Sequence, residues 1–125
     1  MERITSSEYW VEIDSIAENM ASEALSDNDN DIDAARDDIQ DSRLHETIDG
    51  HQWVIYYAYN DDVLYHSENS DYYENNFGTD EMAHTIKERG LDGLKTVMAF
   101  WAMYADVQDI INDKLDEAFE ALGAA

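Results

Sequence analysis

The sequence predicts an all-α protein of four or five helices, with a long amphipathic helix in its C-terminal part. Proline is absent, so no residue forbids a long helix. Apolar residues recur at spacings of three and four over much of the chain. The one segment with the composition of a β-strand, 52–59, has no other segment suited to pair with it. Because 125 residues are typical of one domain and no linker interrupts them, we treat 1–125 as a single acidic helical domain.

The first predicted helix begins at Ser6 or Ser7, either of which can cap it. One face of this helix is apolar and carries Tyr9, Ile13, Ile16, Met20 and Ala24. The opposite face is acidic and carries Glu8, Glu12, Glu18 and Glu23. The polar residues 26–31 favour a turn. A second helix is expected after this turn, with inward-facing Ile32, Ala35, Ile39 and Leu44.

Residues 51–68 have two interpretations. Trp53 to Tyr59 are rich in β-branched and aromatic residues, which favours a strand. Asp49, however, can cap a helix, and neither glycine nor proline interrupts 51–68. We therefore predict one buried helix, whose broad apolar stripe holds Trp53, Tyr56, Tyr57, Val63 and Leu64. The alternative is a minor strand at 52–59 that pairs across a dimer as an edge strand.

The C-terminal part is predicted to contain a polar loop, a short helix and then the longest helix. Residues 69–78 form the loop, and Thr79 caps a helix that ends at Gly90. The helix that begins at Asp92 keeps its 3.6-residue period for about 30 residues, or ~45 Å. A compact domain of this size has a radius of gyration of only ~14 Å. The helix must therefore bend near 106–109, or the molecule is elongated or a homodimer.

The formal net charge of −23 is the strongest functional signal, with 30 Asp and Glu against 7 Lys and Arg. So few cations cannot neutralise many phosphates, which argues against direct binding of nucleic acid. An acidic membrane surface is disfavoured for the same reason. The absence of cysteine excludes disulfides, thiolate catalysis and cysteine-ligated metals. No segment is apolar enough to span a bilayer, and residues 1–5 lack the apolar region of a signal peptide, which predicts a cytoplasmic protein.

No motif predicts an enzyme or a cofactor. The four histidines lack metal-ligand spacing, and neither a nucleophile elbow nor a phosphate-binding glycine loop is present. The segment from Asp27 to Asp38 resembles the calcium loop of an EF-hand, with oxygen side chains at positions 1, 3, 5, 7 and 12. However, Ile32 stands where glycine is required, and Asp38 where glutamate is usual. An acidic turn between helices is the simpler interpretation, and a calcium sensor or small metal-dependent enzyme is the alternative.

The carboxylates form two ladders at four-residue spacing. The first ladder consists of Asp29, Asp33, Asp37 and Asp41, and the second of Asp109, Asp113 and Glu117, with Asp116 and Glu120 alongside. On a helix, such neighbours lie ~5–6 Å apart, and each like-charge pair costs roughly 0.2–0.5 kcal/mol. A surface selected for stability alone would mix charges of both signs. A rigid row of carboxylates is similar to the phosphates of a nucleic-acid strand, so a basic nucleic-acid-binding protein would attract it.

Two tyrosines of the predicted loop, Tyr72 and Tyr73, are further candidates for partner binding. They lie beside the acidic residues Asp71 and Glu74 rather than among apolar ones. Tyrosine is favoured in protein interfaces, so they could anchor a partner. The alternative is that both side chains pack back on the domain.

These features resemble the small acidic inhibitors that phages and plasmids carry against bacterial defences, namely DNA-mimic antirestriction proteins and anti-CRISPR proteins. The segment from Leu44 to Tyr57 also resembles part of small phage and mobile-element proteins. The resemblance implies a non-enzymatic inhibitor in the cytoplasm of a bacterial host, bound to a basic nucleic-acid-binding protein of a defence system.

Two other interpretations of the acidic surface remain open. One is a chaperone or assembly factor for a basic partner, such as a histone-like or phage structural protein. The other is a simple salt-adapted acidic domain, which the few lysines and the pI near 4.1 favour. The ten isoleucines and eight asparagines fit salt adaptation less well.

Overall fold

The computed structural model describes residues 4–56 and 60–123, and every regular element within these ranges is helical. In chain order the elements are α1 (Ser6–Asp27), α2 (Ile32–Asp38), the π-helical turn η1 (Ile39–Arg43), α3 (Leu44–Asp49), α4 (Gln52–Ile55), α5 (Asn60–His66) and α6 (Tyr72–Gly123). The predicted all-α class is confirmed, as is the long C-terminal helix. The first helix begins one residue after its cap, which is Thr5 rather than Ser6 or Ser7, because the Thr5 hydroxyl accepts a hydrogen bond from the Glu8 amide (3.1 Å).

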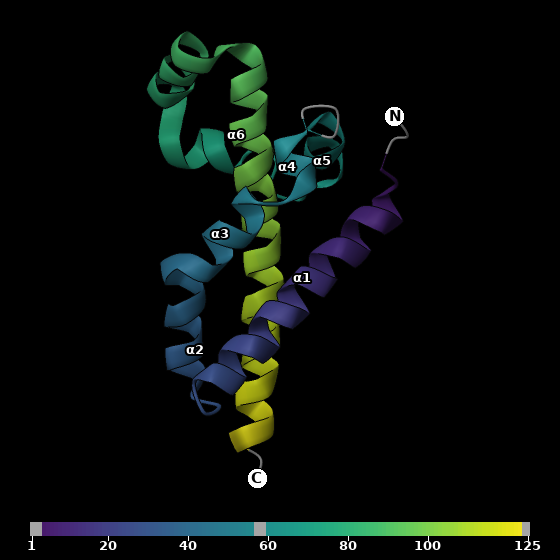
Figure 1. Cartoon of the computed structure of the whole chain (residues 1–125), viewed down its shortest axis with the longest axis vertical. Helices are drawn as coiled ribbons and strands as arrows, with labels where there is room; N and C mark the ends of the chain where they lie inside the picture. Colours follow the sequence, from purple (N-terminus) through teal and green to yellow (C-terminus); the bar gives the residue numbers. More distant parts are fainter. Residues whose placement is uncertain (1–3, 57–59, 124–125) are drawn as a thin grey trace.

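The last part of α6, residues 91–123, runs as a straight ribbon through the whole length of the molecule (Figure 1), and we call it the spine. The backbone of α6 leaves helical geometry at Gly78 and Gly90, where φ is 78° and 77°. Within the spine, α6 has no such departure, so the bend expected near 106–109 is wrong. At ~1.5 Å per residue the spine is about 50 Å long, and the molecule is elongated.

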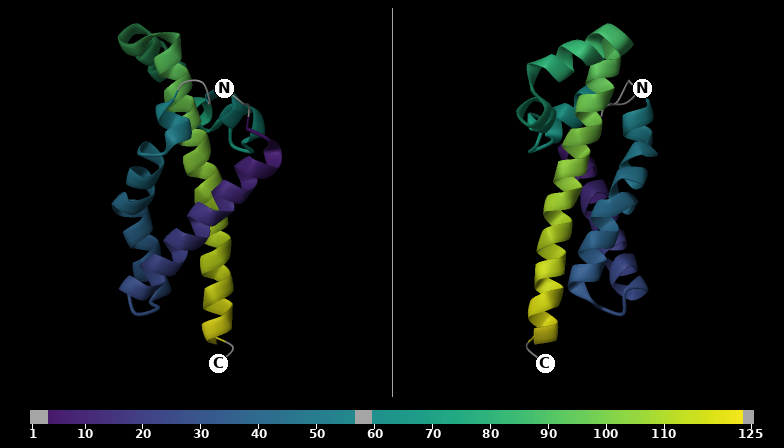
Figure 2. Two further views of the ribbon diagram at one scale, coloured as in Figure 1. Left: turned by 45° about the vertical axis from the view of Figure 1, so that its right-hand side comes forward. Right: turned by 90° about the vertical axis from the view of Figure 1, so that its left-hand side faces the viewer.

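The other helices pack along the spine and bury its apolar residues. Helix α1 crosses the spine diagonally, whereas α2, η1 and α3 run beside it and α4 and α5 lie near its N-terminal half (Figures 1 and 2). The spine buries Met103, Val107, Ile111 and Leu115. Of the predicted inner faces, Tyr9, Ile13, Met20, Ala24, Ala35, Ile39 and Leu44 are buried, while Ile16 and Ile32 are partly buried. The apolar stripe that suggested a dimer is therefore covered largely by the chain itself.

Residues 51–68 do not form the single helix predicted for them. Helix α4 ends at Ile55, because Tyr56 has extended backbone angles (φ −93°, ψ 106°). Trp53 and Val63 are buried as expected, but the Tyr56 side chain is 57% exposed, so the two segments do not share one stripe. The alternative strand is also wrong for 52–55, which are helical, and the rest of that prediction, including Tyr57, falls on residues 57–59, outside the described ranges.

The predicted polar loop at 69–78 is helical from Tyr72 onward. The Tyr72 ring stacks on Trp101 of the spine, with ring centroids 6.0 Å apart. The Phe77 ring packs on the same indole at 5.1 Å. Burial of aromatic rings on the spine therefore outweighs the polar composition of this segment.

Replacing Gly90 by alanine should lower the free energy of unfolding by about 1–3 kcal/mol, because only glycine adopts this combination of positive φ and extended ψ (φ 77°, ψ 179°) without strain. The space around Gly90 would admit a methyl group, so the backbone angle alone causes the loss. Gly50→Ala is the matched control, since Gly50 has φ −86° and its new Cβ would meet only the Glu46 carbonyl oxygen at 3.5 Å. Urea denaturation measures both variants, and equal stabilities would contradict the proposed strain.

Candidate functional site

The first carboxylate ladder is exposed, but it is less regular than the sequence indicated. Asp33 and Asp37 lie in α2, one helical turn apart. Asp29 precedes this helix in a turn with φ 54°, and Asp41 lies in the π-helical turn. Only the step from Asp33 to Asp37 therefore has α-helical geometry, because a π-helical turn is wider than an α-helical one.

The second ladder is regular and lies entirely on the straight spine. Asp109, Asp113, Asp116, Glu117 and Glu120 are all exposed. Asp109 accepts a hydrogen bond from the Asn69 amide (3.1 Å), and Asp116 forms an ion pair with Arg36 of α2 (3.2 Å). The other three carboxylates have no ion pair within the described part of the chain.

The two ladders meet near the C-terminal end of the spine. Asp33 of the first ladder and Asp116 of the second line one shallow pocket together with Ile32, Arg36 and Phe119. The Arg36 guanidinium lies between the ladders and bonds only the second. The two ladders therefore approach each other at Asp33 and Asp116, where α2 lies beside the end of the spine.

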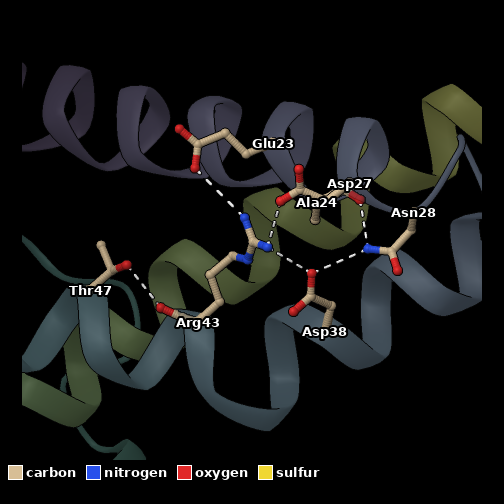
Figure 3. A network of polar contacts seen from close by, with 7 residues as sticks. All are labelled: Glu23, Ala24, Asp27, Asn28, Asp38, Arg43 and Thr47. Atoms are coloured by element: carbon tan, nitrogen blue, oxygen red, sulfur yellow. Dashed lines mark hydrogen bonds and ion pairs between the residues drawn. The ribbon is translucent and has the colours of Figure 1, made fainter.

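The segment that resembles a calcium loop is held by an internal cation, the Arg43 guanidinium (Figure 3). Its Nη2 atom lies 2.8 Å from carboxylate oxygens of both Asp27 and Asp38, the first and last positions of that loop. Hydrogen bonding to Asp27 is the main cause that raises the pKa of Arg43. Asp31, inside the loop, caps α2 by accepting a hydrogen bond from the Ala34 amide (3.1 Å). These roles favour an acidic turn between helices.

No metal site is found in 4–56 or 60–123, where no three His, Asp or Glu side chains converge in a way that could hold an ion. Two of the histidines have other partners instead. The His51 ring accepts a hydrogen bond from the Trp53 amide (3.1 Å) and caps α4, and His66 bonds the Ile4 carbonyl oxygen (2.8 Å).

The two tyrosines proposed as anchors both pack on the domain. Tyr73 is only 4% exposed, and its hydroxyl shares a hydrogen bond with the Thr85 hydroxyl (2.9 Å). Tyr72 is partly buried and stacks on Trp101. Tyr73 is thus inaccessible to a partner, and Tyr72 offers only part of its ring.

A buried polar junction between α1 and the spine was not predicted. The Tyr9 hydroxyl donates a hydrogen bond to the Asp106 carboxylate, which is 1% exposed, and the Asn69 amide donates a second (2.7 Å). Burial is the main cause that raises the pKa of Asp106, and it also raises the pKa of Tyr9. The same Asn69 amide bonds Asp109, so the junction fixes the start of the second ladder. In the sequence, Asp106 is the one carboxylate within the otherwise apolar run 97–107, which was the available signal for this junction.

Within the described residues, no helix is both long and apolar enough to cross a membrane. Comparison with protein-family models, with curated proteins and with solved structures found no match to this chain.

The variant Asp106→Asn tests whether ionisation of the buried carboxylate lowers the free energy of unfolding in a pH-dependent way. Because burial raises its pKa, the folded protein binds the Asp106 proton more tightly than the unfolded chain does. Its contribution to stability is therefore largest at acid pH and falls as pH rises through the raised pKa. The native protein should lose stability relative to the variant as pH rises from ~4 towards neutrality, measured by urea denaturation.

Asp113→Asn, at an exposed site, gives the effect of losing one surface charge and serves as the control. The quantity compared is the free energy of unfolding of the native protein minus that of Asp106→Asn. If this difference stays constant or increases as pH rises, a raised pKa at Asp106 is contradicted.

Proposed function

We propose that this chain is a non-enzymatic inhibitor of a bacterial anti-phage defence nuclease or guide complex, of the anti-CRISPR or antirestriction type. In this proposal it acts as a nucleic-acid mimic that occupies a basic DNA- or RNA-binding surface. One observation carries the proposal. All nine ladder carboxylates are exposed, and eight of them have no ion pair within the described ranges, namely Asp29, Asp33, Asp37, Asp41, Asp109, Asp113, Glu117 and Glu120.

The acidic surface cannot be neutralised from within the chain. Four of the seven cations, Arg36, Arg43, Lys95 and Lys114, already form ion pairs with Asp or Glu. The remaining like-charge neighbours repel one another in the free protein. A partner that brings lysines and arginines to this surface would relieve that repulsion, which favours a basic protein as the binding partner.

Rigidity is the second support for mimicry. The second ladder lies on an uninterrupted helix that is packed against α1 and α2, so its carboxylates keep their spacing in the free protein. Preorganised charges need no ordering on binding, which lowers the entropic cost of association. A nucleic-acid strand likewise presents its phosphates at a regular spacing.

Neutralising either ladder should weaken inhibition while leaving the fold intact. The first variant combines Asp33→Asn, Asp37→Asn and Asp41→Asn, and the second combines Asp113→Asn, Glu117→Gln and Glu120→Gln. Asp109 and Asp116 are left unchanged because they bond Asn69 and Arg36. We expect each variant to inhibit at least ~10-fold less strongly, chiefly through a slower on-rate, and to lose part of its salt dependence. The assay is DNA cleavage by purified restriction enzymes and RNA-guided nucleases.

The matched control removes three charges elsewhere, through Glu18→Gln, Asp71→Asn and Asp80→Asn, all of them exposed. This control should inhibit like the parent if the position of the charges matters. Equal inhibition by the parent and both ladder variants would contradict charge mimicry. Binding to a basic protein that nucleic acid cannot displace would instead support the chaperone interpretation.

A further inference from the structure

A pocket at the N-terminal end of the spine contains none of the ladder carboxylates. It is formed where α3, α4 and the first turns of the spine meet, close to the kink at Gly90. Its volume is about 200 Å³, below the ~300–1,000 Å³ of pockets that hold drug-sized ligands. A ligand of this pocket is therefore a small molecule rather than a segment of another protein.

Half of the residues that line the pocket are apolar or aromatic, namely Val54, Val97, Phe100 and Trp101. Edge-to-face contacts hold the rings in place. The centroid of the Phe100 ring lies 4.9 Å from that of Trp101 and 4.8 Å from that of His45, which also lines the pocket. This part of the lining is therefore formed before any ligand binds, and it suits the apolar part of a ligand.

Two exposed side chains of opposite charge, Arg89 and Asp49, line the same pocket. Neither forms an ion pair within 4–56 and 60–123, with each other or with a third residue, whereas four of the seven cations are bound by Asp or Glu. Asp49 is the last residue of α3, where the carbonyl groups at a helix end disfavour a carboxylate. One positive and one negative group of the pocket are thus both available to a ligand.

Gly93 allows the Arg89 side chain to lie against the first turn of the spine. An added Cβ at Gly93 would be 2.3 Å from the Arg89 Cβ and 3.4 Å from its Nε atom. The first distance is shorter than side chains tolerate, so a larger residue at this position would force Arg89 to move. Gly93 therefore helps to position the guanidinium at the pocket.

We propose that this pocket binds a small zwitterion with an apolar or aromatic side chain, which is the chemistry of a free α-amino acid. Its carboxylate bonds Arg89, its ammonium group pairs with Asp49, and its side chain contacts Phe100 and Trp101. The net charge of −23 repels an anion, and a simple cation would leave Arg89 unpaired, whereas a zwitterion satisfies both groups. Binding here covers neither ladder.

L-Phenylalanine is the probe, and the indole N–H signal of Trp101 in proton–nitrogen correlation NMR spectra is the readout. The variant Trp101→Phe assigns this signal. We expect L-phenylalanine to shift it saturably, with a dissociation constant in the millimolar range or below. The Trp10 signal should hardly move, because Trp10 does not line the pocket. N-Acetyl-L-phenylalanine and L-phenylalaninamide each lack one of the two charges and should bind at least ~10-fold more weakly.

Variants of the two charged residues test which end of the ligand each one binds. Arg89→Gln should weaken binding of L-phenylalanine at least ~10-fold and abolish its advantage over L-phenylalaninamide, because the carboxylate has lost its partner. Asp49→Asn should likewise abolish the advantage over N-acetyl-L-phenylalanine. Lys87→Gln is the matched control, since Lys87 is exposed, lies two residues before Arg89 and does not line the pocket. This control should bind like the parent.

Either of two results would overturn the proposal. The first is a Trp101 signal that does not move with L-phenylalanine up to about 10 mM, so that the pocket is only a gap between solvated side chains. The second is a shift that all three probes produce equally, or that both charge variants retain, because the charges would then play no part. Circular dichroism establishes that each variant is folded. No nuclease enters these measurements, so their outcome is independent of the proposed inhibitory function.

Discussion

The length of the spine is the constraint on which the rest of the structure depends. A straight helix of about 50 Å is longer than any other helix of this chain, so no single helix can cover it. Helix α1 crosses it, with Tyr9 hydrogen-bonded to Asp106 and Asp14 paired with Lys114, and α2 and α3 fill the remaining side. The short helices α4 and α5, together with Tyr72 and Phe77 on Trp101, cover the N-terminal half. The fold is therefore a set of short segments arranged around one rigid rod.

This arrangement leaves most of the charge on the outside. One cation lies where carboxylates approach one another, because Arg43 holds Asp27 and Asp38 together at the end of α1. Elsewhere the repulsion between carboxylates is not relieved by the chain itself. Selection for stability alone would remove such repulsion, whereas a surface used to bind a basic partner would keep it.

Local signals in the sequence predicted local structure well and distant contacts poorly. The apolar faces of α1 and the spine follow directly from 3.6-residue periodicity, and Gly90 marks the kink as expected. The break at Tyr56 has no glycine or proline to announce it, and the helix at Tyr72 depends on Trp101, which is far away in the sequence. The bond between Tyr9 and Asp106 likewise joins residues 97 positions apart. The turn predicted at 26–31 already contains Asp29, whereas the sequence does not announce the π-helical turn that contains Asp41.

The most direct test of the central claim is a competition measurement on a defence nuclease that is found to bind the chain. The apparent dissociation constant of the chain is measured by fluorescence anisotropy at increasing concentrations of a DNA duplex or guide RNA. If the acidic surface occupies the nucleic-acid site, this constant should increase in proportion to the concentration of free nucleic acid, without reaching a plateau. An apparent dissociation constant that does not change, or that reaches a plateau because both ligands bind together, would contradict nucleic-acid mimicry.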